Sequence, residues 1–437
     1  MRFGMRKMFS LRSTGLLFPV MLFVLHAPVS FAAGGSLDLE RRVEILEKTL
    51  ENDNREMKVY YDKGFKMKTR DRNFKFQIGG RIQADFAQLE GNDAFDRAFG
   101  KPENGAEFRR ARVFLTGLLY GRILFRAQYD FAGQTAFNDV YLRFIKIPGG
   151  GNFQVGHFKE PFSLEFLTSA KYITFTERSL MNVFGQGRNL GFGIFNHELN
   201  QRMTWALGIF RPTGDNSPRI QDNEGFSVTG RLTGLPWYED KGGRLLHFGA
   251  AFSFNEISET GTARLSSKPE SNLSLASTLD TGTLRVKTIT KYNFESALVW
   301  DAFNLQGEVT AAHLDRPEPA LDSDLYGFYV EGGWFLTGEH LNYNKSGGIF
   351  GRISPRANAF DGEGWGAWQL AARYSRVDLN GGTTRGGEEE NVTFGINWYL
   401  NPMTRLTFNY ANGDMIRGTG GDGGEVNVYQ MRFQVEF

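Results

Sequence analysis

YQMRFQVEF, residues 429–437, alternates apolar and polar side chains without interruption. One set of alternate positions is apolar and comprises Tyr429, Met431, Phe433, Val435 and Phe437. The set between them is polar and comprises Gln430, Arg432, Gln434 and Glu436. Successive side chains of a β-strand point to opposite faces, so this period of two predicts a strand with one apolar and one polar face.

The same pattern recurs back along the chain to Asn73. We count sixteen such runs, at 73–89, 108–120, 121–132, 137–146, 151–158, 189–199, 202–211, 225–234, 244–256, 284–299, 302–313, 325–337, 366–378, 391–400, 403–412 and 426–437. Most are about ten residues long, which is the length of a tilted strand that crosses a bilayer. An even number of strands suits a closed antiparallel barrel.

The connections between these runs differ in length. Tight turns with Gly or Pro fall at 120–122, 148–151 and 399–403, whereas long polar connections fall at 90–107, 256–283, 379–390 and 412–425. Their alternation is typical of short periplasmic turns and long external loops. The segment 338–365 breaks this alternation, because a short turn is expected there and nearly thirty residues are present.

A soluble β-sandwich and a membrane barrel produce the same alternation, so other features must separate them. Mean hydropathy is −0.36, which by itself suggests a soluble protein. Four features favour an outer-membrane barrel: an export signal, uniform strands, polar faces rich in Arg, Gln and Asn, and the aromatic Phe437 at the end of the last strand. We therefore expect an all-β, sixteen-stranded antiparallel transmembrane barrel over residues 73–437.

The first residues predict export. Four basic residues precede the apolar run Leu16–Leu25, and Ser30-Phe31-Ala32 offers small residues before a cleavage point. We expect a signal peptide at 1–32; the alternative is a membrane anchor. Its removal would take away four of the 50 basic residues and none of the 49 acidic ones, for a mature net charge of −3. A preference for anions must therefore come from the local placement of charges.

Residues 33–72 precede the expected barrel. Leu39, Val43, Leu46 and Leu50 have the 4-3-4 spacing of a short coiled coil. Asp53 interrupts the stripe after about two heptads, so a merely amphipathic helix or a frayed linker is the alternative. A coiled coil here would serve as a periplasmic oligomerisation or tethering segment.

PFSLEFLTSAKYITFTERS, residues 161–179, fits neither a strand nor a loose surface loop. A sixteen-stranded barrel encloses a wide aqueous lumen, so a selective channel needs a constriction. We expect this segment to fold inward, with its aromatic side chains against the wall and its polar atoms toward the channel.

Longer motifs carry a family resemblance. GHFKEPFSLEFLTSAKYITFTERSLMNVFGQGRNLGFGIF, FRRARVFLTGLLYG, WFLTGE and GAWQLAARYSRVDL resemble the phosphate-selective porin O and P family, from about Phe74 to Phe437. The resemblance implies a homotrimeric outer-membrane channel whose pore is lined by an arginine ladder. It also implies a constriction lysine that sets anion selectivity.

Carried over by similarity, the constriction and anion-binding residues are Lys171, Arg109, Arg110, Arg231, Arg244, Arg219 and Asp139. Lys171 is the only lysine between Pro161 and Ser179, and Asp139 is matched to an acidic residue beside the constriction lysine. The chemistry is consistent with this, because the planar fork of Arg pairs two phosphate oxygens and a series of moderate sites lets an ion move on.

Two expectations weaken the ladder. Glu160, Glu165 and Glu177 flank Lys171 in sequence and could neutralise it. Any single inward arginine is expected to pair with a carboxylate or to hold the loop; these arginines are Arg81, Arg112, Arg122, Arg126, Arg143 and Arg373.

The sequence contains no pattern that favours an enzyme, a metal site or a cofactor. Its histidines are scattered, and no P-loop or nucleophile elbow is present. We expect a passive channel for small anions, with phosphate or polyphosphate as partners beside outer-membrane lipid and lipopolysaccharide, and no nucleic-acid partner. A weakly selective general porin is the alternative; an outer-membrane barrel enzyme or surface adhesin is a third possibility.

Overall fold

The computed structural model describes residues 41–45, 57–62, 64–133, 136–148, 151–214, 225–257, 261–362, 364–417 and 423–437. The chain divides into two units, residues 1–54 and 55–437. In the first unit, only the helical residues 41–45 are described, so the expected signal peptide and most of the expected coiled coil lie outside the described residues. No described helix has the length and apolar character needed to cross a membrane.

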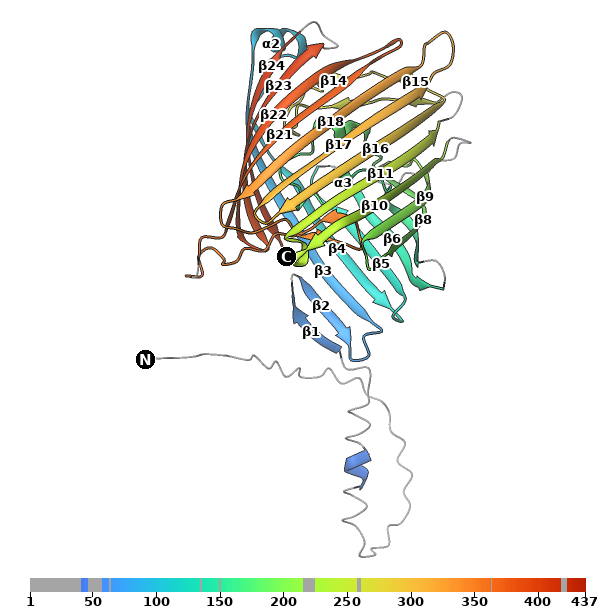
Figure 1. Cartoon of the computed structure of the whole chain (residues 1–437), viewed down its shortest axis with the longest axis vertical. Helices are drawn as coiled ribbons and strands as arrows, with labels where there is room; N and C mark the ends of the chain where they lie inside the picture. Colours follow the sequence, from blue (N-terminus) through green and yellow to red (C-terminus); the bar gives the residue numbers. More distant parts are fainter. Residues whose placement is uncertain are drawn as a thin grey trace, which may run out of the picture. The chain divides into compact units, whose positions relative to one another are not determined.

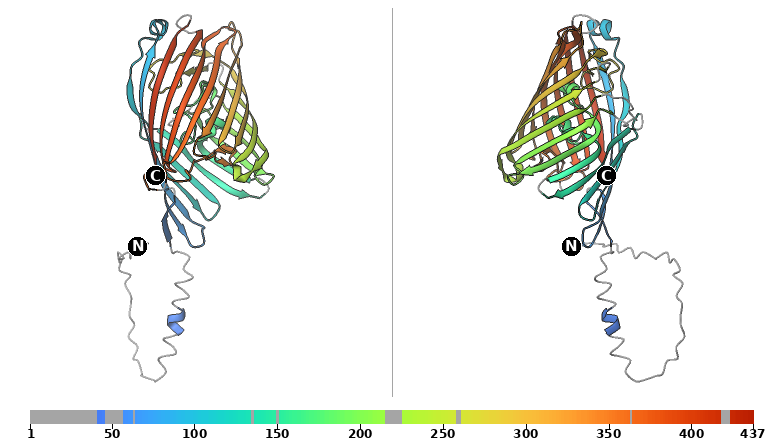
Figure 2. Two further views of the ribbon diagram at one scale, coloured as in Figure 1. Left: turned by 60° about the vertical axis from the view of Figure 1, so that its left-hand side comes forward. Right: turned by 90° about the vertical axis from the view of Figure 1, so that its right-hand side faces the viewer.

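The second unit is a closed antiparallel β-barrel (Figures 1 and 2). Among the described residues the main sheet holds eighteen strands, and all of them except β1 and β2 form the wall. These sixteen wall strands are β3 (Lys75–Gly91), β4 (Gly105–Leu119), β5 (Ile123–Asp130), β6 (Ala136–Ile147), β7 (Gly151–Lys159), β8 (Arg188–Glu198), β9 (Met203–Arg211), β10 (Ser227–Glu239), β11 (Arg244–Glu256), β16 (Thr288–Trp300), β17 (Phe303–Asp315), β18 (Ser323–Phe335), β21 (Ala367–Gly381), β22 (Thr384–Asn401), β23 (Thr404–Arg417) and β24 (Glu425–Glu436). Each pairs with the next, and β24 pairs with β3 to close the barrel. The predicted sixteen-stranded wall is confirmed.

The hairpin of β1 (Met57–Tyr61) and β2 (Phe65–Thr69) extends the sheet at the beginning of β3. These strands fall within residues 33–72, for which we expected a helix. The sheet therefore begins earlier than the expected boundary at residue 73.

The two faces of the wall differ as the alternation predicts. In β24, Tyr429, Met431 and Phe433 are about two-fifths exposed, whereas Gln430 and Arg432 are buried inside. Aromatic pairs gather on strand ends near the short turns; these pairs are Trp237–Trp300, Phe303–Trp334 and Trp368–Trp398. An apolar outer band with an aromatic belt and a polar interior is the arrangement of a barrel in lipid.

The connections alternate between a long-loop end and a short-turn end. One expected loop, 379–390, is wrong, because β21 and β22 continue through it to a tight turn after Gly381. Cross-strand pairing of Arg376 with Glu390 and an Arg376–Glu388 ion pair stabilise this extension. The long segment between β18 and β21 lies at the short-turn end, where Phe335 N donates to Ala302 O at 2.9 Å.

Three connecting segments contact the inner face of the wall. From residues 160–187, the backbone N–H groups of Leu164 and Glu165 donate to Glu308 of β17 at 3.0 and 2.6 Å. From residues 261–286, Glu270 accepts from Ser375 of β21 at 2.6 Å. The latter segment and the one between β18 and β21 were not expected to reach the interior.

The segment between β18 and β21 contains the short strands β19 (Tyr343–Asn344) and β20 (Ile349–Phe350). The hydroxyl of Tyr343 lies 2.6 Å from Nδ1 of His247, and Gly348 O accepts from Arg231 at 2.8 Å. Buried apolar residues from this segment pack with Leu164 and with the wall residue Leu245. The lumen is therefore partly filled from the short-turn end as well.

Candidate functional site

A cavity of about 350 Å³ lies between the inner faces of β3–β8 and residues 166–178. Its basic lining residues are Arg81, Arg109, Arg110, Arg112, Arg126, Lys159, Lys171, Arg178 and Arg188. Among the described lining residues, Asp139 is the one carboxylate. We call this space the cationic cavity. It contains three of the residues carried over by similarity as cations, namely Lys171, Arg109 and Arg110.

A β-bulge places two consecutive arginines in this cavity. Gln83 of β3 pairs with Arg110 of β4, but the next residue, Ala84, pairs with Phe108, which leaves Arg109 as the extra residue. Strict alternation would direct one of the two arginines to the outer face. The bulge removes that restriction, and both side chains reach Glu177: Arg109 Nε at 2.8 Å and Arg110 Nη2 at 3.7 Å.

Glu177 joins residues 160–187 to the wall. Its carboxylate also pairs at 2.8 Å with Arg432 of β24, which in turn pairs with Asp85 at 2.6 Å. Burial opposes the ionisation of Glu177, but Arg109, Arg110 and Arg432 hold its pKa well below the ordinary value. Glu177 therefore stays anionic and offsets part of the positive charge beside it.

Lys171 lines the cationic cavity near the short-turn end. Its Nζ pairs with Glu436 of β24 at 2.8 Å, and Arg352 contacts the same carboxylate. The three glutamates that flank Lys171 in sequence have other partners among the described residues. Glu160 accepts from Ser227, Glu165 accepts from Ser179, and Glu177 pairs with arginines. The neutralising group is thus Glu436, which sequence proximity did not indicate.

Sequence reasoning missed Lys159, the last residue of β7. Its Nζ lies 4.6 Å from the ring centre of Phe166 and donates to the Phe166 carbonyl. Asp139 lies on the neighbouring strand and pairs with Arg188 at 2.8 Å and with Arg126 at 3.6 Å. The only available signal was the position of Lys159 in GHFKEP, where the strand pattern ends.

A second cavity of about 450 Å³ adjoins the first, because Asp139, Lys159 and Leu167 line both. Its other lining residues include Tyr141, Arg143, Gln154, Phe158, Phe195, His197 and Arg231. We call it the aromatic cavity. Residues 346–349, from the segment between β18 and β21, contribute to its lining at the short-turn end.

The other arginines that the family resemblance named do not line the cationic cavity among the described residues. Arg231 lines the aromatic cavity, but it is buried and pairs with Glu295 at 2.5 Å. The same carboxylate contacts His247. Arg244 is more than one-third exposed at the short-turn end, pairs with Asp301 at 3.1 Å and stacks on Trp300. It lines neither cavity, because its strand position points outward. Arg219 lies outside the described residues.

Among the described residues, three of the six other inward arginines pair with carboxylates, one of them being Arg126, which pairs with Asp139 at 3.6 Å. Arg112 binds Asp130 at 2.5 Å, and Arg373 binds Glu270 at 2.5 Å. Arg81 donates to Ser169 of residues 161–179 and so contacts the segment, as the second half of the expectation states. Arg143 donates to a neutral wall residue, Gln154. No cluster of three or more metal-ligating side chains occurs in the part of the chain that the structure describes.

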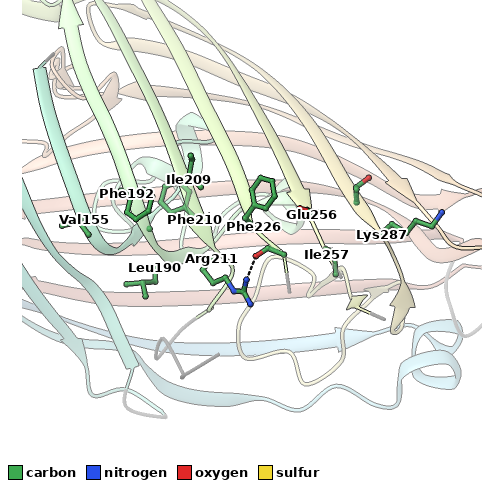
Figure 3. A pocket seen from close by; sticks show the side chains of 13 residues that line it. Val155, Leu190, Phe192, Ile209, Phe210, Arg211, Phe226, Glu256, Ile257 and Lys287 are labelled. Carbon is green, nitrogen blue, oxygen red and sulfur yellow. Dashed lines mark hydrogen bonds between the residues drawn. The ribbon is translucent and has the colours of Figure 1, made fainter. Parts of the chain in front are cut away.

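A further pocket of about 840 Å³ lies near the long-loop end and is lined by residues of β7, β8, β9, β11 and β16 (Figure 3). Leu190, Phe192 and Ile209 in its lining are about half exposed on the outer face. Arg211 at its edge donates to Gly225 O at 3.1 Å. This apolar pocket belongs to the outer surface and is separate from the cationic lumen.

The molecule is similar to several solved outer-membrane proteins. A loop L8 deletion variant of OmpT, an outer-membrane protein of Vibrio cholerae, is 11% identical, with a TM-score of 0.52 over 84% of this chain and 100% of that one. OmpF of Salmonella typhi, in a complex with daunomycin, is also 11% identical, with a TM-score of 0.51 over 86% of this chain and 100% of that one. At these identities the likeness shows the fold alone.

Sequence comparison is more specific. Porin O of Pseudomonas aeruginosa is 24% identical over 423 residues, which covers 86% of this chain and 91% of that protein. Residues 76–437 match the family described as phosphate-selective porin O and P. That match spans the barrel, the cationic cavity and the segment 160–187. The chain therefore belongs to the phosphate-selective porin O and P family of outer-membrane porins.

Proposed function

We propose that this protein is a passive, water-filled channel for small anions, with phosphate or polyphosphate as the preferred solute. The observation that carries the proposal is the clustering of nine basic side chains around the cationic cavity. A weakly selective general porin is the second candidate, and the buried carboxylates beside the arginines favour it.

The charge balance around the cavity supports anion preference. Glu177 forms ion pairs with both Arg109 and Arg110, and Asp139 forms ion pairs with both Arg126 and Arg188. Arg112 and Lys171 each pair with a carboxylate of their own. The cations that donate to neutral oxygens are Arg81, Lys159 and Arg178. Positive charge is therefore in excess, and fixed donors can replace part of the hydration shell of a passing anion.

Residues 161–179 act in this proposal as the inward-folded constriction loop. Arg405 Nη1 donates to Ile173 O at 2.7 Å, and Thr176 N donates to Asn409 at 2.8 Å, so contacts to β23 support an inward position. Lys171 is one constriction cation, and we add Lys159 because it stands where the two cavities meet. Asp139 orients Arg126 and Arg188 around it.

The proposal also covers cleavage of the signal peptide and the oligomeric state of the barrel. In this proposal, export removes residues 1–32, residues 33–72 form the periplasmic N-terminal segment, and the barrel assembles as a homotrimer among outer-membrane lipid and lipopolysaccharide. OmpT of Vibrio cholerae has been solved in a trimer form, which supports the oligomeric state by analogy of fold. The mass of the purified chain tests the cleavage, and chemical crosslinking in membranes tests the trimer.

Planar-bilayer recording tests the function. In a KCl gradient, the zero-current potential should have the sign of anion preference, and added phosphate should reduce the chloride current. Cation preference would overturn the proposal. Anion preference without any phosphate block would favour the weakly selective porin instead.

A further inference from the structure

The aromatic cavity contains an arginine that is not neutralised by a carboxylate. Arg143 of β6 donates from Nε to Gln154 Oε1 at 2.6 Å, and no ion pair joins it to an acidic residue across the described ranges. Its guanidinium carbon lies 5.5 Å from the ring centre of Tyr141 and 5.3 Å from that of Phe195. Within the described ranges its two terminal nitrogens have no hydrogen-bond partner, so they can bind an anion.

Two glycines and a buried phenylalanine pack closely against Tyr141 and Phe195. Gly156 pairs with Tyr141 across β6 and β7 and has a φ of 135°, and a Cβ there would lie only 2.6 Å from Tyr141 Cα. A Cβ at Gly193 would lie 2.9 Å from the ring of Phe195. Phe158 is buried beside both rings, with its ring centre 6.1 Å from that of Tyr141 and 6.0 Å from that of Phe195. Phe158 therefore packs against both rings, while Tyr141 and Phe195 line the cavity.

From this arrangement we infer that the aromatic cavity is a second binding site, for anions that carry a planar organic group, such as aryl phosphate monoesters. The anionic group binds Arg143 or Lys159, and the planar group stacks on Tyr141 and Phe195. The volume is sufficient, since a cavity of about 150 Å³ holds benzene and this one measures about 450 Å³. The inference rests on the proposed function, because such a solute must also pass the cationic cavity.

Two esters of equal charge test the inference. Phenyl phosphate and methyl phosphate are compared as blockers of chloride current in planar bilayers. Phenyl phosphate should block at a roughly 3- to 10-fold lower concentration, because stacking adds to the shared electrostatic attraction. In Tyr141→Leu and Phe195→Leu the two esters should block equally, while inorganic phosphate block and chloride conductance stay unchanged.

The outcomes separate this inference from the proposed function. If both esters block the wild-type channel equally, or if phenyl phosphate keeps its advantage in both leucine variants, the aromatic site is wrong although the anion channel stands. Loss of anion preference in the wild type would instead overturn the proposed function. Unchanged chloride conductance in either leucine variant establishes that this variant has folded.

Discussion

At the scale of single residues, Lys159 is the cation whose position matters most for selectivity. It lines both cavities together with Asp139 of the neighbouring strand, and its one hydrogen bond among the described residues goes to a backbone carbonyl. Lys171, by contrast, is held by Glu436 at 2.8 Å. In our proposal, the charge of Lys159 therefore acts on a passing ion more strongly than the charge of Lys171.

We expect Lys159→Gln to lower the anion-to-cation permeability ratio roughly fivefold, because removing one unit charge about 4 Å from the ion removes about 1 kcal/mol of attraction even in bulk water. Reversal potentials in a KCl gradient measure the ratio. Lys101→Gln, at an exposed position in the first long loop, is the matched control and should leave it unchanged. Equal ratios in wild type and Lys159→Gln would exclude Lys159 from the conducting path.

At the scale of elements, the β-bulge in β4 places one additional positive charge, that of Arg109, in the lumen. Because Arg109 is the extra residue, deleting it restores regular pairing between Ala84 and the rest of the strand. Val113 lies four residues further along β4, in a regularly paired stretch. Deleting it would shift the register by one residue and move the inward side chains to the outer face.

Deletion of Arg109 should therefore yield a folded barrel with weaker phosphate block, whereas deletion of Val113 should prevent folding. Heat-modifiable migration on denaturing gels, with boiled and unboiled samples compared, reports folding. A folded Val113 deletion would contradict the register argument, and an unfolded Arg109 deletion would contradict the bulge.

The segment 261–286 is a second element with a defined anchor. Glu270 is buried and accepts from Ser375 at 2.6 Å and Thr393 at 2.7 Å, and it pairs with Arg373 at 2.5 Å. Removing one partner of a buried ion pair costs about 3–5 kcal/mol. The segment should be released from the lumen when this carboxylate is lost.

We expect Glu270→Ala to increase single-channel conductance and to expose residues 261–286 to proteolysis in intact membranes. Glu103→Ala, on an exposed loop position, is the control. Unchanged conductance together with unchanged protease resistance would show that Glu270 does not anchor the segment.

At the scale of the whole molecule, stability depends on the apolar outer surface. Phe433 is 43% exposed on the outward face of β24, and its ring centre lies 6.1 Å from that of Phe86 of β3 across the closing seam. A cation on the lipid face is penalised most strongly at the middle of the bilayer. Arg432, one position earlier, is accommodated because it points inward to Asp85.

Phe433→Arg should lower the free energy of unfolding from lipid vesicles by about 2–4 kcal/mol. Reversible denaturant titration followed by tryptophan fluorescence measures the change. Phe433→Leu is the matched control and should change stability much less, since it keeps the outer face apolar. A negligible effect of Phe433→Arg would mean that this face does not contact hydrocarbon.

The sequence alone determined the wall. Alternation is a local property of each strand, so YQMRFQVEF and fifteen other runs were sufficient to predict the sixteen strands and their two faces, and the long motifs were sufficient for the family. The resemblance also named Arg109, Arg110 and Lys171, and these three residues line one cavity.

Only the tertiary structure decided the charges and contents of that space. Lys171 and its partner Glu436 are 265 positions apart, Arg373 and Glu270 are 103 apart, and no local period links such pairs. The bulge at Arg109 requires the register against β3, and the outward position of Arg244 requires the end of β11 to be known. Strand faces follow from neighbouring residues, whereas the electrostatics of a lumen follow from residues that meet only when the barrel closes.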